Sequence, residues 1–450
     1  MYRTAIVNPD DLVYLRPLKT LLDGSLCMLV DEHGKTDRLS QDGVMTGTAR
    51  IQSIDIGIIY QDFRVNGASV GKDTARRMMA LMEQVQAEGM PLVFLMHSLG
   101  VRITQGRTIF DDAFSVIPSL FALKRRSPLI TVAMGNSIGI NAIYFAQGHI
   151  RLAQEAACLN LAGPEVHRRF FGDRNQTYQQ FTSAAHQQRV NTLVHETAPD
   201  HAGLFARIRE LVPGLTLGAT GKATPANVDQ ELAELLQQLG EVTELFPAKG
   251  PDVRVFLGEK DGRHVGYFIN PPRRPNNLLS VAAIDKCLAA LELFNTLGAS
   301  MVSFADCPGG DPRQGESDAD GLGKLTLLVQ RIIEYPHAKM GFVYGRCFGG
   351  TGMLLFPKIF GGDRIVAVEG AQIGIMNDNI IKELLSGTPR LLAEWQTANA
   401  EETPDLADLI AAGTVSKVIK KELISWEISA FLSRHPAKQA SDDASYVVLG

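Results

Sequence analysis

Two short glycine-rich stretches hold the residues best suited to chemistry. Residues 135–140 are GNSIGI and residues 345–350 are GRCFGG, and each follows an apolar run. Glycine lets a backbone approach a ligand closely, and the first amides of a following helix have no partner inside that helix. Such a turn can donate hydrogen bonds to an oxygen that becomes negative during a reaction, which makes it one side of an oxyanion hole.

Each half of the chain carries a second turn of this kind. Residues 98–102 are SLGVR and residues 307–312 are CPGGDP, and both follow an apolar run. Two turns side by side would supply two main-chain donors to one oxygen atom. The sequence therefore predicts one backbone oxyanion hole in each half.

A nucleophilic serine is the alternative interpretation of the first stretch. Gly135 to Gly139 fits the Gly-x-Ser-x-Gly elbow of hydrolases, in which Ser137 would attack the substrate. That reaction needs an acidic residue and a histidine downstream, and several of each are present. The second stretch has Cys347 at the matching place, and a backbone hole needs no nucleophile, so we favour the hole.

Apolar runs and helical spacing around these turns predict an α/β chain. The expected strands are 92–96, 129–134, 301–306 and 340–344, and the expected helices are 73–88, 106–128, 281–296 and 322–334. Three pairs of glycines lie 210 positions apart, namely Gly135 with Gly345, Gly139 with Gly349, and Gly100 with Gly310. A shared offset of this kind indicates an internal duplication. The Gly- and Pro-rich stretch 213–226 predicts the boundary, which gives domains 1–225 and 226–450.

Composition limits the function classes. The 450 residues are 45% hydrophobic and carry a net charge of −5, which gives no electrostatic case for nucleic acid or an anionic membrane. The N-terminus lacks a signal-peptide pattern, and no apolar stretch approaches the roughly 20 residues of a membrane span. The five cysteines form no C-x-x-C pair, so we expect no metal site and a cytoplasmic protein.

The order of motifs resembles a known family. The motifs are DGVMTGTARI (42–51), HSLGVRITQG (97–106), GNSIGINAIY (135–144), ADCPGGDPRQG (305–315) and FGGTG (348–352). Together they are similar to the carboxyltransferase (beta) subunits of biotin-dependent acyl-CoA carboxylases and decarboxylases. The resemblance implies two tandem crotonase-like domains of the ClpP/crotonase β-β-α superhelix type. The first would face the acyl thioester and the second would face biotin.

The resemblance also assigns residues. It implies that Gly139 and Ile140 hold the thioester oxygen beside Gly100 and Val101, with His97 and Arg102 near the substrate. It implies that Gly350 and Thr351 hold the ureido oxygen of carboxybiotin beside Gly309, Gly310 and Gly349.

By the same resemblance, the chain would move a carboxyl group from carboxybiotin to the α-carbon of a CoA or carrier-protein thioester, through enolates in the two holes. The expected partners are a biotin carboxylase, a separate biotin carrier protein and further copies of the chain, as a dimer or a trimer of dimers. A malonyl-thioester decarboxylase component and a non-catalytic scaffold remain alternatives.

Departures from the family pattern fall on the acyl half. Paired glycines are usual where this chain has Leu99-Gly100 and Gly139-Ile140, and an acidic residue is usual at His97. We expect the Ile140 side chain to narrow or reshape the acyl pocket. The acyl group is therefore expected to be unusual, for example one carried by a protein.

Overall fold

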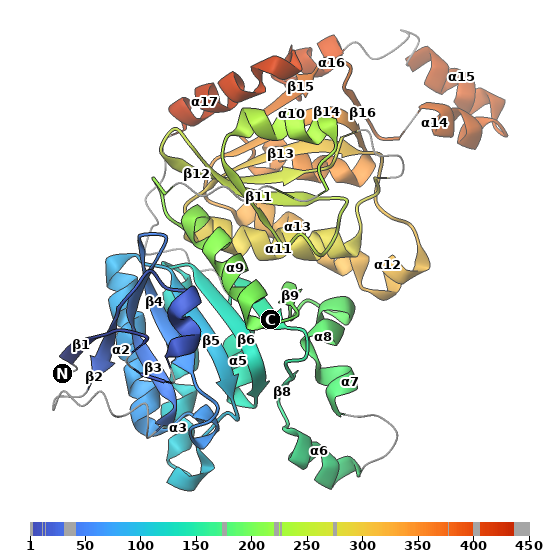
Figure 1. The fold of residues 1–450 in the computed structure, drawn as a ribbon. Helices are drawn as coiled ribbons and strands as arrows, with labels where there is room; N and C mark the ends of the chain where they lie inside the picture. Colours follow the sequence, from blue (N-terminus) through green and yellow to red (C-terminus); the bar gives the residue numbers. More distant parts are fainter. Residues whose placement is uncertain are drawn as a thin grey trace. The chain divides into compact units, whose positions relative to one another are not determined.

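The computed structural model describes residues 3–10, 12–13, 15–30, 42–172, 178–219, 225, 227–272, 277–376, 378–398 and 406–435. The chain divides into two compact units, Met1–Gly221 and Lys222–Gly450, each built on its own sheet (Figure 1). The sequence placed the boundary at 225/226. The expected α/β class is confirmed, since strands and helices alternate in both units.

The first unit is one mixed sheet with helices around it. Its strands lie in the order β1 (Arg3–Val7), β2 (Leu26–Val30), β3 (Val44–Ile51), β4 (Ile54–Gln61), β5 (Leu92–Ser98), β6 (Leu129–Ile138), β7 (Ile150–Gln154) and β9 (Glu196–Ala198). The β1 to β4 pairs are antiparallel and the β4 to β9 pairs are parallel. The short β8 (Leu159–Asn160) pairs only with the end of β6.

The second unit repeats this order. Its strands are β10 (Val242–Leu245), β11 (Arg254–Lys260), β12 (Arg263–Ile269), β13 (Ser300–Cys307), β14 (Lys339–Phe348), β15 (Arg364–Val368) and β17 (Lys417–Ile419). The β10 to β12 pairs are antiparallel, the β12 to β17 pairs are parallel, and β16 (Gln372–Gly374) pairs with the end of β14.

Helices connect the strands. In the first unit they are η1 (Arg16–Thr20), η3 (Asn66–Ala68), α2 (Lys72–Glu88), η4 (Ile103–Gln105), α3 (Ile109–Phe114), α4 (Val116–Lys124), α5 (Ile140–Ala146), α6 (Pro164–Phe171), α7 (Tyr178–Thr182), α8 (Ala184–Val190), α9 (His201–Leu211) and η5 (Val212–Leu215). In the second they are α10 (Gln230–Leu239), α11 (Val281–Thr296), α12 (Gln314–Asp318), α13 (Gly321–Glu334), η6 (Gly349–Leu355), η7 (Lys358–Phe360), α14 (Asp378–Leu385), α15 (Pro389–Ala398), α16 (Leu406–Ala411), η8 (Lys421–Leu423) and α17 (Ile424–Arg434).

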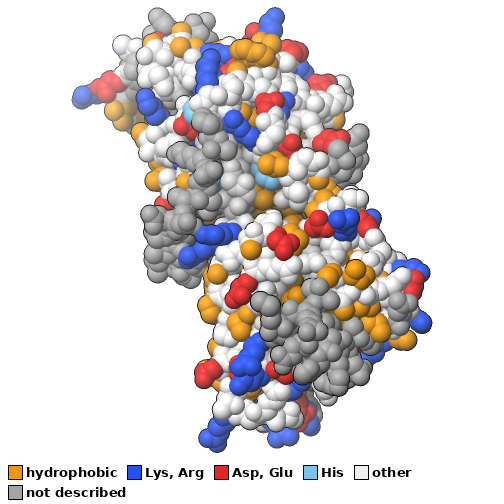
Figure 2. Space-filling view, turned by 90° about the vertical axis from the view of Figure 1, so that its left-hand side faces the viewer, with side chains coloured by type: hydrophobic (Ala, Val, Ile, Leu, Met, Phe, Trp, Pro, Cys, Tyr) orange, Lys and Arg blue, Asp and Glu red, His pale blue; other side chains and the backbone are white. Residues whose placement is uncertain are grey.

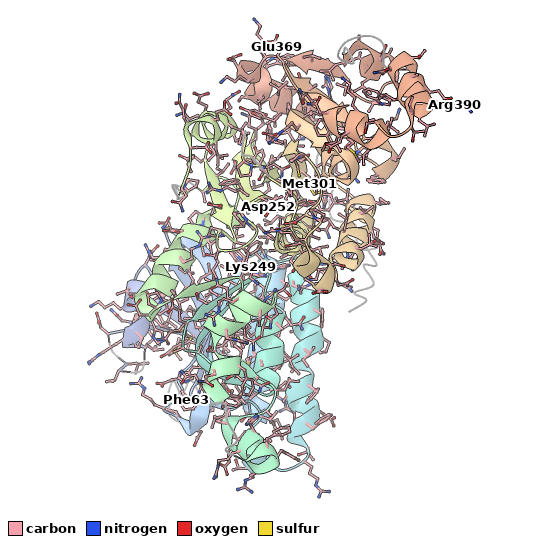
Figure 3. All side chains as sticks on the ribbon, turned by 90° about the vertical axis from the view of Figure 1, so that its right-hand side faces the viewer. Phe63, Lys249, Asp252, Met301, Glu369 and Arg390 are labelled. Carbon is pink, nitrogen blue, oxygen red and sulfur yellow. The ribbon has the colours of Figure 1, made fainter. Side chains whose placement is uncertain are left out.

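Most predicted elements are confirmed, including α2, α11 and α13. The expected helix over 106–128 is instead two short helices, α3 and α4. Apolar side chains of the strands are buried, as Met301 of β13 is (Figure 3). Among the described helices, none has both the length and the apolar character that a bilayer crossing requires. On the face drawn in Figure 2, acidic and basic side chains are interspersed.

Strand register confirms the duplication and corrects one pairing. In the first unit, Gly57 pairs with Leu92, which pairs with Leu129. In the second unit, Gly266 pairs with Met301, which pairs with Lys339. Equivalent residues of the two units are thus 209 positions apart in β4 and β5 and 210 positions apart in β6. The structural equivalent of Gly100 is therefore Gly309, not Gly310.

Each central helix rests on a glycine in the sheet. A Cβ placed on Gly57 of β4 would lie 2.2 Å from Cγ2 of Val85 in α2, and a Cβ placed on Gly266 of β12 would lie 2.2 Å from the ring of Phe294 in α11. Val85 and Phe294 are also equivalent positions of the duplication. The absence of a side chain at Gly57 and Gly266 therefore lets α2 and α11 pack closer to their sheets than any other residue at these two positions would allow.

We expect Gly57→Ala to lower the free energy of unfolding by about 1–3 kcal/mol, because a tightly packed site resists an added methyl group. Val85→Ala removes the clashing atom, so the double variant should cost less than the two single changes together. Urea unfolding followed by circular dichroism measures this. The control is Gly315→Ala, whose Cβ would have no atom within 4 Å. Additive costs at Gly57 and Val85 would contradict the packing argument.

Candidate active site

The two predicted glycine turns are shorter than the sequence suggested. Strand β6 continues through Asn136 and Ser137 to Ile138, and the turn into α5 consists of Gly139, with φ 63°. In the second unit β14 likewise continues to Phe348, and Gly349 turns with φ 59°. The expectation that 135–139 and 345–349 are turns is therefore wrong, because β8 and β16 extend the sheet alongside them.

An irregularity redirects the two strand ends. β5 and β6 pair at Met96 with Ala133 and next at Ser98 with Ser137, so β6 carries two more residues than β5 over this interval. The second unit repeats the shift between the Ala305–Val343 and Cys307–Cys347 pairs. β8 pairs with β6 from Ser137 onward, and β16 pairs with β14 from Arg346 onward, so both short strands begin at the end of the shifted interval. The bulge therefore aims each strand end at the turn that carries the candidate amides.

The structure brings Gly100 beside the start of α5. A Cβ on Gly100 would lie 2.7 Å from the carbonyl oxygen of Ile138 and 3.6 Å from the amide nitrogen of Ile140. Gly100 has φ 92°, a left-handed conformation that favours glycine. The 98–102 turn and the β6–α5 turn, which are far apart in sequence, therefore meet as predicted.

Hydrogen bonds decide which amides remain available. The Gly139 amide donates to the carbonyl of Asn160 at 2.9 Å, and the Gly100 amide donates to Oγ of Ser98 at 3.0 Å. Neither is an open donor, which corrects the part expected of Gly139. Within the described residues, the amides of Val101 and Ile140 have no hydrogen-bond partner, so they are the candidate donors.

The Ile140 side chain is buried, which leaves it little surface with which to narrow or reshape a pocket. It is only 5% exposed and packs in the core of the first unit with Phe94 and Tyr144. Its backbone amide can therefore face a ligand while its side chain stabilises the fold. The exposed apolar group at this turn is Leu99, which is 54% exposed and covers Gly67.

The second unit has an equivalent pair. The offset of 210 makes Gly350 the counterpart of Ile140, and the offset of 209 makes Gly310 the counterpart of Val101. A Cβ on Gly310 would have no atom within 4 Å, so a ligand has room beside its backbone. Gly309 and Gly349 both have positive φ, 156° and 59°, like Gly100 and Gly139. Thr351 instead corresponds to Asn141, and its side chain lies outside the described residues.

His97 is half-buried between the ring of Phe63 and the backbone of Gly135. Its ring stacks on Phe63, labelled in Figure 3, with centroids 4.2 Å apart, and a Cβ on Gly135 would lie 2.5 Å from the ring. Burial, with a smaller effect of His201, lowers the His97 pKa from 6.5 to about 4, although Asp62 raises it. His97 is therefore neutral at neutral pH.

The second unit has an ion pair at the position of His97. Its counterpart is Asp306, which accepts hydrogen bonds from the backbone amide of Arg346 at 3.0 Å and from its Nε at 2.9 Å. A Cβ on Gly345 would lie 2.6 Å from Cγ of Asp306. The duplicated sites thus differ in charge at one equivalent position.

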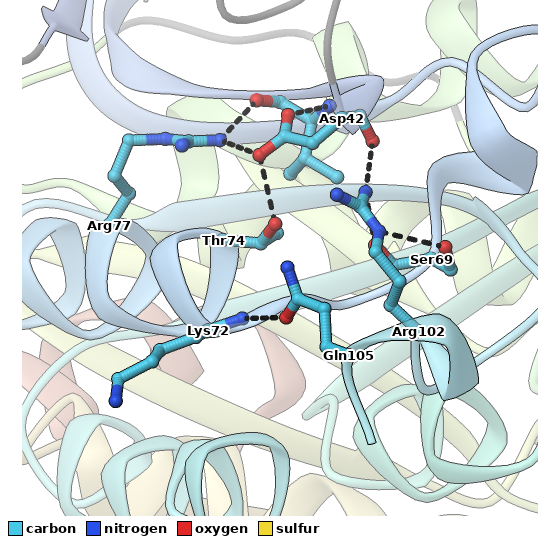
Figure 4. Close-up of polar contacts among 8 residues, drawn as sticks. Asp42, Ser69, Lys72, Thr74, Arg77, Arg102 and Gln105 are labelled. Carbon is cyan, nitrogen blue, oxygen red and sulfur yellow. Dashed lines mark hydrogen bonds and ion pairs between the residues drawn. The ribbon is translucent and has the colours of Figure 1, made fainter. Parts of the chain in front are cut away.

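Arg102 points at the backbone of its own unit (Figure 4). Its Nη2 donates to the carbonyl oxygens of Ser69 at 2.8 Å and Asp42 at 3.2 Å, and its Nε donates to Oγ of Ser69 at 3.2 Å. The Asp42 carboxylate in turn accepts from Thr74 at 2.9 Å and from Arg77 at 2.6 Å. Arg102 therefore connects three segments in this structure.

A buried amide pair, which the sequence analysis missed, anchors the start of α5. Gln61 and Asn141 exchange two side-chain hydrogen bonds of 3.1 Å each, and Gln61 also accepts from the His97 amide at 3.1 Å. The sequence offers one indication of this pair, namely the polar residue Asn141 within the apolar stretch that follows Gly139.

The hydrolase interpretation gains no support. Ser137 lies inside β6, is fully buried, and its Oγ has no hydrogen-bond partner in the part of the chain that the structure describes. No histidine or carboxylate of the described residues therefore accepts a hydrogen bond from this hydroxyl. In the same described ranges, no group of three or more His, Cys, Asp or Glu residues is arranged to hold a metal ion.

Comparisons with known proteins identify related sequences and folds. The family model for the carboxyl transferase domain matches residues 24–261. The propionyl-CoA carboxylase beta chain of Saccharopolyspora erythraea is 21% identical over 439 residues, which cover 87% of this chain and 78% of that protein. The methylmalonyl-CoA decarboxylase subunit alpha of Veillonella parvula is 22% identical over 374 residues, covering 75% and 71%.

One solved structure shares the fold over nearly the whole chain. Transcarboxylase 12S, solved as a hexamer with hydrolyzed methylmalonyl-coenzyme A bound, matches with a TM-score of 0.75 at 22% identity, over 95% of this chain and 91% of that one. The match extends beyond the residues of the family model and so covers both sheets.

We expect His97→Asn to flatten the pH dependence of stability between pH 6.5 and pH 4. In that window the unfolded chain binds a proton that folded His97, with its pKa of about 4, does not bind, so acidification destabilises the wild type. The half-buried ring limits the effect to on the order of 1 kcal/mol. The measurement is the difference in urea midpoint between wild type and variant across this pH range. Equal pH slopes would contradict the buried, neutral state.

Proposed function

The chain belongs to the carboxyl transferase domain family, and from that membership we propose that it is the carboxyltransferase component of a biotin-dependent acyl-CoA carboxylase. Its reaction is the transfer of a carboxyl group between biotin and the α-carbon of an acyl thioester. The observation that carries this proposal is the pair of equivalent turns in each unit, with Gly100 against the Ile140 amide in the first.

The first unit would hold the acyl thioester. The open amides of Val101 and Ile140 would donate to the thioester oxygen while the α-carbon loses its proton and charge moves onto that oxygen. Biotin that has given up its carboxyl group would be the acceptor for this proton. Donors fixed in a folded backbone need no reorganisation as this charge develops, which makes them effective stabilisers of the transition state. No acidic or basic side chain of this unit is required at the oxygen.

The second unit would hold biotin. The positions of Gly310 and Gly350 carry no side chain, and space is open at Gly310, so a flat ring could approach both amides. When bound, biotin would supply the carboxyl group on its ureido ring. Gly310 and Gly350 would hold the ureido oxygen and orient the ring, while Gly309 and Gly349 provide the left-handed turns.

The partners follow from this division of labour. Biotin would arrive on a separate carrier protein after a biotin carboxylase has carboxylated it. Each unit of the chain would have the crotonase-like β-β-α superhelix fold. Further copies of the chain would complete the enzyme as a dimer or a trimer of dimers, and we place it in the cytoplasm. The hexamer named for the structurally similar transcarboxylase supports the oligomer.

The reverse direction is the second candidate function. The similar Veillonella protein is named as a decarboxylase subunit, and the same two holes serve carboxylation and decarboxylation because both directions share one transition state. The acyl group is expected to be unusual, since the departures from the family pattern, including His97, lie in the first unit.

We expect Ile140→Pro to lower kcat for carboxyl transfer about 10²- to 10³-fold, because proline deletes the candidate donor amide at the start of α5 while fitting the first position of a helix. The assay is carboxyl transfer between a carboxylated CoA thioester and free biotin. Ile140→Val keeps the amide and should retain near-wild-type turnover.

The proposal fails if wild-type protein neither transfers a carboxyl group nor exchanges α-protons of any acyl thioester. Unchanged kcat in Ile140→Pro with an active wild type would reject only the assignment of the first hole.

A further inference from the structure

The loop before α2 is held in a strained conformation. Asn66, Gly67 and Ala68 all have left-handed φ, at 51°, 57° and 43°. Left-handed φ costs a residue with a side chain about 1–3 kcal/mol, so two of these three positions are unfavourable. Such a loop persists only if contacts from outside it outweigh the strain.

The 98–102 turn of the candidate hole donates hydrogen bonds to this loop. The Gly67 carbonyl accepts from the amide of Leu99 at 3.0 Å, and the Val70 carbonyl accepts from the amide of Arg102 at 2.9 Å. The Ala68 carbonyl accepts from Oγ of Ser98 at 2.8 Å. The strained loop and the 98–102 turn are therefore one hydrogen-bonded unit, and movement of one displaces the other.

The Arg102 side chain adds hydrogen bonds to those that the backbone of the 98–102 turn donates to the strained loop. Its guanidinium donates hydrogen bonds to the carbonyl and the hydroxyl of Ser69 and to the carbonyl of Asp42. Asp42 is fixed in turn by a buried ion pair with Arg77, in which the Arg77 side chain is 3% exposed and the Asp42 side chain 8%. Figure 4 shows this chain of contacts from Arg77 to Arg102. Val101, the candidate donor, is the residue directly before this anchor.

The second unit rigidifies the equivalent turn in a different way. Pro308 and Pro312 flank Gly309 and Gly310 there, and proline fixes φ without any side-chain partner. By the offset of 209, the first unit has Leu99 and Ile103 at those places, and the counterpart of Arg102 is Asp311. The guanidinium contacts thus occur where the prolines are missing.

We propose that Arg102 is a positioning residue: it fixes the Val101 amide in the first hole, in the role that two prolines have in the second. This inference rests on the proposed function for its effect on turnover. It assigns Arg102 to the backbone of its own unit rather than to a phosphate or carboxylate of the substrate.

The experiment compares Arg102→Gln with Arg102→Lys and with Arg107→Gln, a change of the same kind at an exposed arginine. We expect Arg102→Gln to lower kcat for carboxyl transfer about 10- to 100-fold, because small displacements of a catalytic donor are costly, and to change KM less than about 2-fold. Lysine cannot span three acceptors, so Arg102→Lys should be intermediate. Arg107→Gln should match the wild type.

A second change tests rescue. Ile103 begins η4, where proline is favoured, and its amide has no partner among the described residues. Adding Ile103→Pro to Arg102→Gln should restore turnover several-fold by rigidifying the turn. A structural or substrate-contacting arginine would not be rescued in this way.

Hydrogen exchange of the amides of residues 66–72 and 98–104 gives a readout that does not depend on activity. Arg102→Gln should speed this exchange about 10-fold, and the proline should slow it again. Unchanged exchange, or a rise in KM with constant kcat, overturns the proposal. An inactive wild type with exchange that responds as expected would reject the proposed function and leave the positioning role standing.

Discussion

The close approach of Gly100 to the peptide groups of Ile138 and Ile140 constrains the candidate site of the first unit. No side chain fits at Gly100, since its Cβ would lie 2.7 Å from the Ile138 carbonyl oxygen. The neighbouring strands β5 and β6 must therefore end at the same level, and the bulge between Met96 and Ser98 brings them there. Once they do, the amides of Val101 and Ile140 come to the same edge of the sheet.

The duplication preserves this backbone arrangement while the side chains around it differ. Gly309 and Gly349 repeat the left-handed turns of Gly100 and Gly139, and the shifted strand pairing recurs at Cys307 and Cys347. In contrast, a neutral His97 occupies the place of the ion-paired Asp306. Two units with the same main-chain donors can thus present different environments to two different substrates.

Much of the fold could be predicted from sequence because its signals are local. Helix α2 has apolar residues at helical spacing and a glycine stop, and β5 and β13 are short apolar runs. The predicted meeting of residues 98–102 with Ile140 also followed, since parallel strands end at a common edge. The extension of β6 through Asn136 and Ser137 could not be predicted, because its partner β8 begins about twenty residues later and has no pattern of its own.

The sequence by itself determined where the glycines, strands and central helices lie, and that the chain is duplicated. Only the tertiary structure decided which amides are open, because a hydrogen bond depends on which acceptor the fold brings near. Gly139 donates to Asn160 and Gly100 to Ser98, which leaves Val101 and Ile140. The one-residue change of offset between β5 and β6 was likewise set by strand register, a property of paired backbones that spacing along one chain does not contain.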